Sequence, residues 1–137
     1  MPAAVRFISA EPLPGPLEGL DLCGRYAVLG MTTQELIELA GQRLAEAARS
    51  PARVILFGSA ARGELTRDSD LDFLVIERDV ENSVAEAVRL RDAIGRIGWP
   101  VDVIVMDENL AGRRSKVRGT MVHHALREGR IVARSAS

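Results

Sequence analysis

Short apolar segments alternate with amphipathic ones from residue 31 onward, and this alternation restricts the chain to a sheet packed against helices. The spacing predicts strands over residues 54–57, 70–76, 101–106 and about 131–133. It predicts helices over about 33–49, 81–97 and 115–128. Thr32, followed three residues later by Glu35, forms a capping box for the first helix. We therefore predict an α/β fold, a small mixed β-sheet flanked by helices.

The first thirty residues differ from the rest of the chain. Four of the six prolines lie here, together with four glycines. These residues break helices and strands, and the segment shows neither a helical nor a strand period. We interpret residues 1–30 as an irregular or disordered N-terminal extension, with one short strand near residues 26–29. Residues 31–137 then form the folded domain.

Composition excludes several classes of protein. The 18 basic and 19 acidic residues give a net charge of −1, which excludes a strongly basic protein held on nucleic acid by counterion release. The single cysteine, Cys23, excludes an intramolecular disulfide or a multi-cysteine zinc site. The sequence contains neither a long apolar run nor a signal peptide, so we expect a cytoplasmic protein that binds neither membranes nor nucleic acid directly.

Most of the candidate functional residues lie between residues 58 and 72. Gly58 and Ser59 follow a buried strand, and such a turn offers backbone N–H groups to phosphate oxygens. Asp70 and Asp72 lie two residues apart on the next strand, so both carboxylates point to the same face, about 6–7 Å apart. At that distance the two charges repel by about 2.5 kcal/mol, which a divalent cation would relieve.

Asp102 is the predicted third member of this acidic group. It interrupts the apolar run 101–106, where an unpaired carboxylate would be costly. Three carboxylates from neighbouring strands form an oxygen-rich, partly open site that suits Mg²⁺. A solvated polar strand face is the alternative for any single Asp-x-Asp, but the Gly-Ser turn and Asp102 together favour the metal site.

Two other motifs are less compatible with the sequence. Gly58 and Gly63 have the spacing of a P-loop, but Glu64 stands where that motif needs lysine. Residues 68–72 begin like an EF-hand loop, but Phe73 replaces the glycine that the loop needs at its sixth position. Neither an ATPase nor a calcium loop is therefore predicted.

The combined pattern resembles the polymerase-beta-type nucleotidyltransferases, in which Gly-Ser is followed after ten residues by Asp-x-Asp. Residues 61–63, 68–73 and 101–104 are similar to the compact minimal nucleotidyltransferases of that superfamily. The resemblance implies a polymerase-beta-like fold over about residues 32–134. It also implies transfer of a nucleotide from a triphosphate to an acceptor hydroxyl, with release of pyrophosphate.

The resemblance further implies a role for each site residue. Gly58 and Ser59 would hold the triphosphate of ATP, the expected donor, with Arg62 and Ser69 as further nucleotide-binding residues. Asp70 and Asp72 would bind two Mg²⁺ ions, about 3.5–4 Å apart. Asp102 would bind the catalytic Mg²⁺ and accept the proton of the attacking hydroxyl.

Many minimal nucleotidyltransferases are antitoxins that pair with a HEPN-type ribonuclease toxin and transfer AMP from ATP to one of its tyrosines. The resemblance therefore implies a hetero-oligomer with a HEPN toxin. Two alternatives remain: a non-catalytic antitoxin that neutralises its toxin by binding, and an aminoglycoside-type enzyme that modifies a small molecule.

A basic cluster, defined as Arg113, Arg114, Lys116 and Arg118, lies where the last helix is predicted to begin. Cations at a helix N-terminus oppose the macrodipole, so helix stability does not explain them. We therefore interpret the cluster as a contact surface for nucleoside phosphates or an acidic partner.

Overall fold

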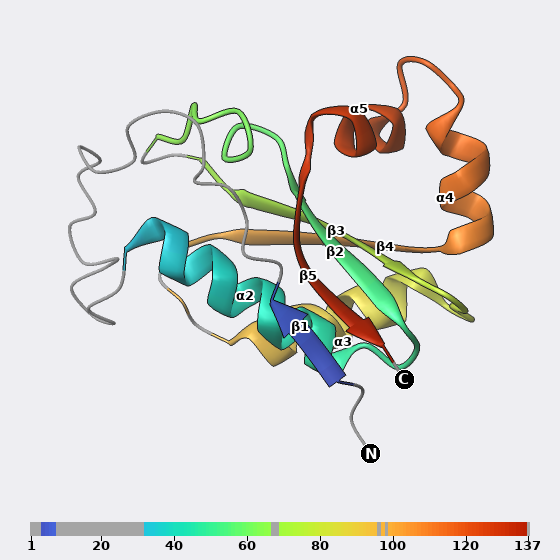
Figure 1. Ribbon diagram of the computed structural model, residues 1–137, viewed down its shortest axis with the longest axis horizontal. Helices are drawn as coiled ribbons and strands as arrows, with labels where there is room; N and C mark the ends of the chain where they lie inside the picture. Colours follow the sequence, from blue (N-terminus) through green and yellow to red (C-terminus); the bar gives the residue numbers. More distant parts are fainter. Residues whose placement is uncertain (1–3, 8–31, 67–68, 96, 98, 137) are drawn as a thin grey trace.

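The computed structural model describes residues 4–7, 32–66, 69–95, 97 and 99–136. Its five-stranded mixed sheet has the strand order β1-β5-β2-β3-β4, in which only β3 and β4 are parallel neighbours (Figure 1). The strands are β1 Ala4–Phe7, β2 Ala52–Phe57, β3 Leu71–Glu77, β4 Val101–Asp107 and β5 Arg130–Ala136. The helices are α2 Thr33–Ala47, α3 Ser83–Ile94, α4 Glu108–Ser115 and α5 Met121–Glu128. The predicted fold, a mixed sheet flanked by helices, is confirmed.

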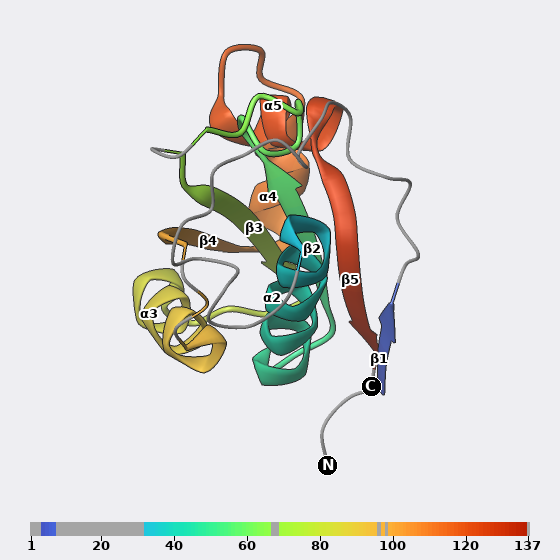
Figure 2. The same ribbon diagram turned by 90° about the vertical axis from the view of Figure 1, so that its left-hand side faces the viewer.

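Helices cover both faces of the sheet, α2 and α3 on one side and α4 and α5 on the other (Figure 2). The alternation along β3 assigns each side chain to a face. Leu71, Phe73 and Val75 belong to the core beneath α2 and α3, whereas Leu74 and Ile76 belong to the core beneath α4 and α5. The predicted two-residue alternation is confirmed, and it places Asp72 on the side of α4 and α5.

The capping box predicted for the first helix is present. The Thr32 hydroxyl accepts a hydrogen bond from the Glu35 N–H, and the Glu35 carboxylate accepts one from the Thr32 N–H. The second helix is shorter than the predicted range of 81–97. It begins after Asn82, whose side chain caps the Ala85 N–H, and it ends at Gly95, which has a φ of 72°.

The prediction of one helix over residues 115–128 is wrong. The structure has two helices, because Asp107 caps α4, Thr120 caps α5, and Gly119 between them has a φ of +85°. Arg113 and Arg114 therefore lie in the last turn of α4, where positive charge favours the macrodipole. Helix stability accounts for these two residues, and this removes the argument that made the basic cluster a ligand surface.

The N-terminal extension contains a strand that was not predicted. Residues 4–7 form β1, which pairs antiparallel with β5 in a register that sets Val5 opposite Ser135. A four-residue strand has too short a pattern to recognise, and its partner lies about 130 residues away in sequence. The strand expected near residues 26–29 lies outside the described residues.

Gly41 lets α2 approach β5 closely. A Cβ at Gly41 would lie 2.8 Å from Cγ2 of the buried Val132, whereas a Cβ at Gly112 in α4 would have no atom within 4 Å. We expect Gly41→Ala to lower the free energy of unfolding by about 1–3 kcal/mol through overpacking. Gly112→Ala, the matched control, should raise it by about 0.5–1 kcal/mol through helix propensity.

Urea unfolding of both variants checks this difference. A Gly41→Ala variant that is as stable as Gly112→Ala would show that α2 and β5 do not pack as closely as described.

Candidate active site

The three aspartates lie at one end of the paired strands β3 and β4. Asp72 is the second residue of β3, and Asp102, the second residue of β4, is its register partner in the parallel pair. Neighbouring strands are about 4.8 Å apart, so the two backbones are adjacent. Asp70 directly precedes β3. Asp70 and Asp72 are half-buried, and Asp102 is exposed.

Repulsion within this group acts on Asp72. Burial, followed by the Asp102 and Asp70 carboxylates, raises the pKa of Asp72 above its ordinary value, while the Arg62 guanidinium lowers it. The two carboxylates must lie near Asp72 for this to happen. The fold therefore brings together the three predicted residues, although they come from positions 32 residues apart in sequence.

Gly58 lies against Asp72 on the opposite side from Asp102. Phe57 and Asp72 are register partners in the antiparallel pair of β2 and β3, so the chain turns beside the Asp72 side chain. Gly58 has a φ of 76°, and a Cβ at this position would lie 2.5 Å from Asp72 Oδ2. Only glycine fits both the backbone conformation and the space.

The turn after Gly58 offers N–H groups to a ligand. Its later N–H groups are used internally: Arg62 donates to Gly58 O and Ser59 O, and Glu64 donates to Ser59 O. The N–H groups of Ser59, Ala60 and Ala61 donate to no acceptor within the described residues. Free N–H groups of successive residues in a turn favour an anion, as predicted for the triphosphate.

Arg62 is placed between the turn and α5. Its side chain is 45% exposed, and it forms ion pairs with Glu64, at 3.3 Å, and with Glu128 at the end of α5, at 4.0 Å. Glu128 is not among the predicted site residues, because no local signal connects it to Arg62. These contacts hold the guanidinium where it acts on Asp72.

The Ser69 hydroxyl, which is predicted to bind the nucleotide, forms hydrogen bonds with Thr66. It accepts a hydrogen bond of 2.8 Å from the Thr66 N–H and lies 3.1 Å from the Thr66 hydroxyl. These bonds join Thr66 to Ser69, the residue that precedes Asp70. A nucleotide-binding role for Ser69 remains a prediction.

Asp70, Asp72 and Asp102 offer carboxylate oxygens, the kind of ligand that Mg²⁺ prefers. Within the residues that the structure describes, no group of three or more His, Cys, Asp or Glu side chains lies close enough together to hold a metal ion. The carboxylates of Asp70, Asp72 and Asp102 are nevertheless neighbours that repel one another, and a hard cation with oxygen ligands would relieve this repulsion. These three residues would hold the metal.

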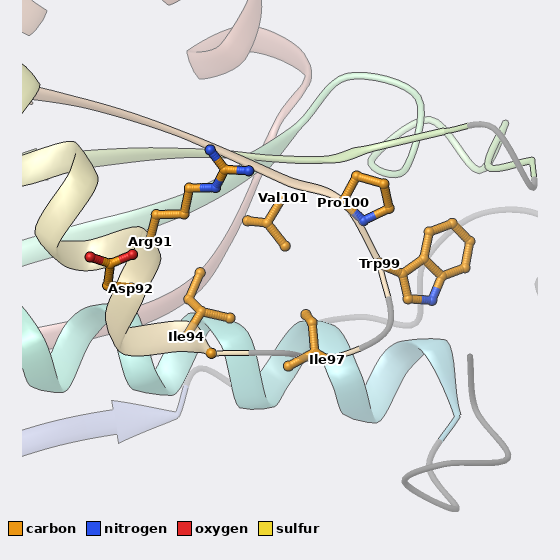
Figure 3. Close-up of a pocket in the computed structure, with 8 residues that line it drawn as sticks. Arg91, Asp92, Ile94, Ile97, Trp99, Pro100 and Val101 are labelled. Carbon is orange, nitrogen blue, oxygen red and sulfur yellow. The ribbon is translucent and has the colours of Figure 1, made fainter. Parts of the chain in front are cut away.

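A cavity of about 500 Å³ lies beside the start of β4, but it is separate from the carboxylates (Figure 3). Ile94, Ile97 and Trp99 line it together with Val101, whose side chain belongs to the core beneath α2 and α3. Asp102 alternates to the other face of the sheet. The cavity is therefore not part of the acidic site.

Comparison with known proteins decides the family. The family described as "Nucleotidyltransferase domain" matches residues 39–124, a range that includes Gly58, Asp70, Asp72 and Asp102. The chain belongs to this nucleotidyltransferase family. It is an enzyme of the nucleotidyltransferase class.

Two individual proteins are similar to this nucleotidyltransferase. A Methanocaldococcus jannaschii protein named "Putative protein adenylyltransferase" is 31% identical over 81 residues, which cover 58% of this chain and 76% of that protein. The crystal structure of a "putative nucleotidyltransferase" from Sulfolobus solfataricus matches with a TM-score of 0.49 and 23% identity, over 75% of this chain and 86% of that one. The family assignment rests on the first protein and on the family match.

Among the helices that the structure describes, none combines the length and the apolar composition that a membrane span requires.

Gly58 provides a first test of the nucleotidyltransferase site. We expect Gly58→Ala to lower the free energy of unfolding by about 1–3 kcal/mol, because it combines backbone strain with a clash against Asp72 Oδ2. Gly119→Ala is the matched control, since Gly119 also has positive φ but no atom within 4 Å of a Cβ.

Urea unfolding and a nucleotidyl-transfer assay on both variants separate strain from the clash. Gly58→Ala should lose both stability and transfer, and Gly119→Ala should lose only stability. Full transfer activity in Gly58→Ala would contradict the close approach of this turn to Asp72.

The raised pKa of Asp72 provides a second test. A carboxyl whose folded pKa is raised loses its contribution to stability as pH rises through that pKa, so ionised Asp72 destabilises the fold at neutral pH. In EDTA at pH 7, we expect Asp72→Asn to have a higher Tm than wild type. Adding MgCl₂ should raise the Tm of wild type and leave that of Asp72→Asn nearly unchanged.

Thermal unfolding with and without Mg²⁺ is the measurement, and Asp92→Asn, at an exposed position on α3, is the control. Equal Tm increases in wild type and Asp72→Asn would show that Mg²⁺ does not bind at this carboxylate.

Proposed function

We propose that this nucleotidyltransferase is a Mg²⁺-dependent protein adenylyltransferase that transfers AMP from ATP to a tyrosine hydroxyl of a HEPN ribonuclease toxin. The observation that carries the proposal is the position of Asp72, between the Gly58 turn on one side and Asp102 on the other. That arrangement sets an anion-binding turn beside paired carboxylates. Phosphoryl-group transfer needs both.

The residues of this chain have distinct tasks in the proposed reaction. The free N–H groups after Gly58 and the Arg62 guanidinium bind the triphosphate oxygens. The acceptor oxygen forms a bond to the α-phosphorus, and the bond from that phosphorus to the pyrophosphate oxygen breaks. Magnesium, when bound, neutralises the carboxylates and stabilises the charge on the attacking and leaving oxygens.

Asp102 is the residue best placed to receive the acceptor's proton. It is exposed, and it lies on β4 at one edge of the sheet, so an incoming hydroxyl reaches it without crossing the protein. Asp70 and Asp72 are less exposed and lie on the inner side of the pair. In this proposal Asp102 accepts the proton, and Asp70 and Asp72 bind Mg²⁺ together with it.

A protein acceptor is supported by the similarity to the M. jannaschii protein and its name. The proposal of a HEPN toxin as that acceptor rests on the resemblance to minimal nucleotidyltransferases. It predicts a hetero-oligomer in which the partner presents a tyrosine to the exposed end of β4.

The proposed reaction is tested with α-labelled ATP, MgCl₂ and the co-purified partner. We expect label on a partner tyrosine, located by mass spectrometry. Asp102→Asn should reduce the transfer rate by about 10²–10⁴-fold, because it removes the proton acceptor. Asp92→Asn, on the opposite helical layer, should leave the rate unchanged.

Other outcomes select the alternatives. Absence of label, together with full neutralisation of the toxin by Asp102→Asn, would replace the proposal with a binding antitoxin. Pyrophosphate release that depends on an aminoglycoside, without any protein partner, would replace it with small-molecule modification.

A further inference from the structure

Strand β4 forms a free edge of the sheet. It pairs with β3 through seven consecutive register partners without a shift, and no other strand of the described residues lies on its outer side (Figure 2). Native proteins protect edge strands with bulges, prolines or charges near the centre, because unpaired N–H and C=O groups can pair with another chain. The centre of β4, Val103-Ile104-Val105, has none of these features. β4 is therefore open to pairing with a further strand.

The parallel ladder fixes which backbone groups of β4 face this free edge. The Leu71 N–H donates to the Pro100 carbonyl at 2.9 Å, and from this bond the pairing alternates along the strand. The residues that bond to β3 are Asp102, Ile104 and Met106. The residues whose N–H and C=O groups face outward are Val101, Val103 and Val105. Val103 is half-buried and the other two are buried, so Val103 is the most accessible of the three.

Helix α3 presents an apolar surface beside the same edge. It packs against β4, whereas α2 packs against β2 and β5 (Figure 2). Glu86 of α3 faces the turn after α2, where Arg49 Nε lies 3.8 Å from its carboxylate. Val84 and Val88, two residues before and after Glu86, lie on the opposite side of the helix, away from α2. They are 73% and 56% exposed, and they lie on the side of the free edge.

Helix stability does not explain these two valines. Valine is a weaker helix former than alanine or leucine, and exposure leaves its apolar surface in water. The edge and the helix together offer main-chain hydrogen-bonding groups at Val103 and apolar contacts at Val84 and Val88. An extended peptide segment uses both, because its backbone pairs with a strand edge and its alternate side chains contact the surface beside that edge.

We propose that β4 binds an extended segment of the protein substrate as an added strand, with the acceptor hydroxyl beside Asp102 and apolar side chains on Val84 and Val88. The inference rests on the protein adenylyltransferase function proposed above. Side chains of a strand alternate between faces, so the acceptor shares the face of Asp102 while its two neighbours face α3. Cross-strand Cβ atoms are about 5 Å apart, and an aromatic side chain also reaches the diagonal position. The expected substrate is therefore a tyrosine flanked by apolar residues.

The probe is a capped peptide with the sequence Lys-Val-Gln-Val-Tyr-Val-Gln-Val-Lys, titrated into the isotope-labelled full chain and followed by NMR. In the free protein the Ile104 N–H, which bonds to β3, should exchange slowly with solvent, and the Val103 N–H should exchange fast. We expect the peptide to shift the Val103 and Val88 signals saturably and to protect the Val103 N–H from exchange. The control peptide Lys-Val-Val-Gln-Tyr-Gln-Val-Val-Lys has the same composition without the alternation, and it should bind about tenfold more weakly.

Methylated peptides test the main-chain hydrogen bonds without altering the protein. Antiparallel addition is the more stable arrangement per residue, and in it the N–H groups of the two valines beside the tyrosine face β4. N-methylation of these two valines should weaken binding at least about tenfold, because it removes both donors. N-methylation of the two glutamines, whose N–H groups then point away from β4, is the matched control and should leave binding nearly unchanged.

Two protein variants test the surface of α3. Val88→Lys keeps a good helix former but replaces the apolar contact with a charge, so it should weaken peptide binding about fivefold. Val117→Lys is the matched control, since Val117 is 53% exposed in the turn between α4 and α5. The kcat/KM for transfer of labelled AMP from ATP to the peptide tyrosine should fall by the same factor in Val88→Lys and stay unchanged in Val117→Lys.

Binding and transfer separate this inference from the proposed reaction. Saturable binding at Val103 without any transfer of label would contradict the reaction and support the added strand. The added strand is overturned if the peptide does not bind saturably, if both methylated peptides bind as the unmodified one does, or if Val88→Lys and Val117→Lys bind it equally well. Protection of the Val103 N–H that rises with protein concentration in the absence of peptide would show that a second copy of the chain occupies this edge, and it would also overturn the proposal.

Discussion

The parallel register of β3 and β4 is the constraint on which the active site depends. It sets Asp102 directly beside Asp72, while the antiparallel register of β2 and β3 brings Gly58 to the other side of the same carboxylate. A one-residue shift of β4 would turn Asp102 to the opposite face, into the core beneath α2 and α3. The acidic site therefore depends on this strand pairing.

Strand β3 carries an acidic residue near each end, and the surroundings give the two different properties. Asp72 is half-buried beside the like charges of Asp70 and Asp102, with Arg62 nearby. A bound cation would relieve the repulsion between these carboxylates. Glu77 is fully buried and hydrogen-bonded to the turn after α2, and burial, followed by the neighbouring Glu86, raises its pKa to about 7. The apolar core on both faces of the sheet offsets the cost of burying these groups.

Much of the fold and the candidate site could be predicted because the signals are local. Thr32 and Glu35 are close enough to cap a helix by themselves, and the alternation from Leu71 to Ile76 fixes which side chains share a face. The last helix was misplaced because Asp107 and Thr120 give equally good caps, and the sequence pattern did not separate two short helices from one. The pairing of β1 with β5 could not be predicted, since nothing local links residues 4–7 to residues 133–136.

The sequence by itself determined the chemical groups and their local spacing: a Gly-Ser turn, two aspartates on one strand face, and a third in a later strand. These follow from covalent order and from the two-residue period of a strand. Only the tertiary structure decided that Asp102 lies beside Asp72, that Glu128 pairs with Arg62, and that Glu86 faces Glu77. Such contacts join residues 9 to 66 positions apart, and they form only when the burial of apolar surface fixes how helices and strands pack.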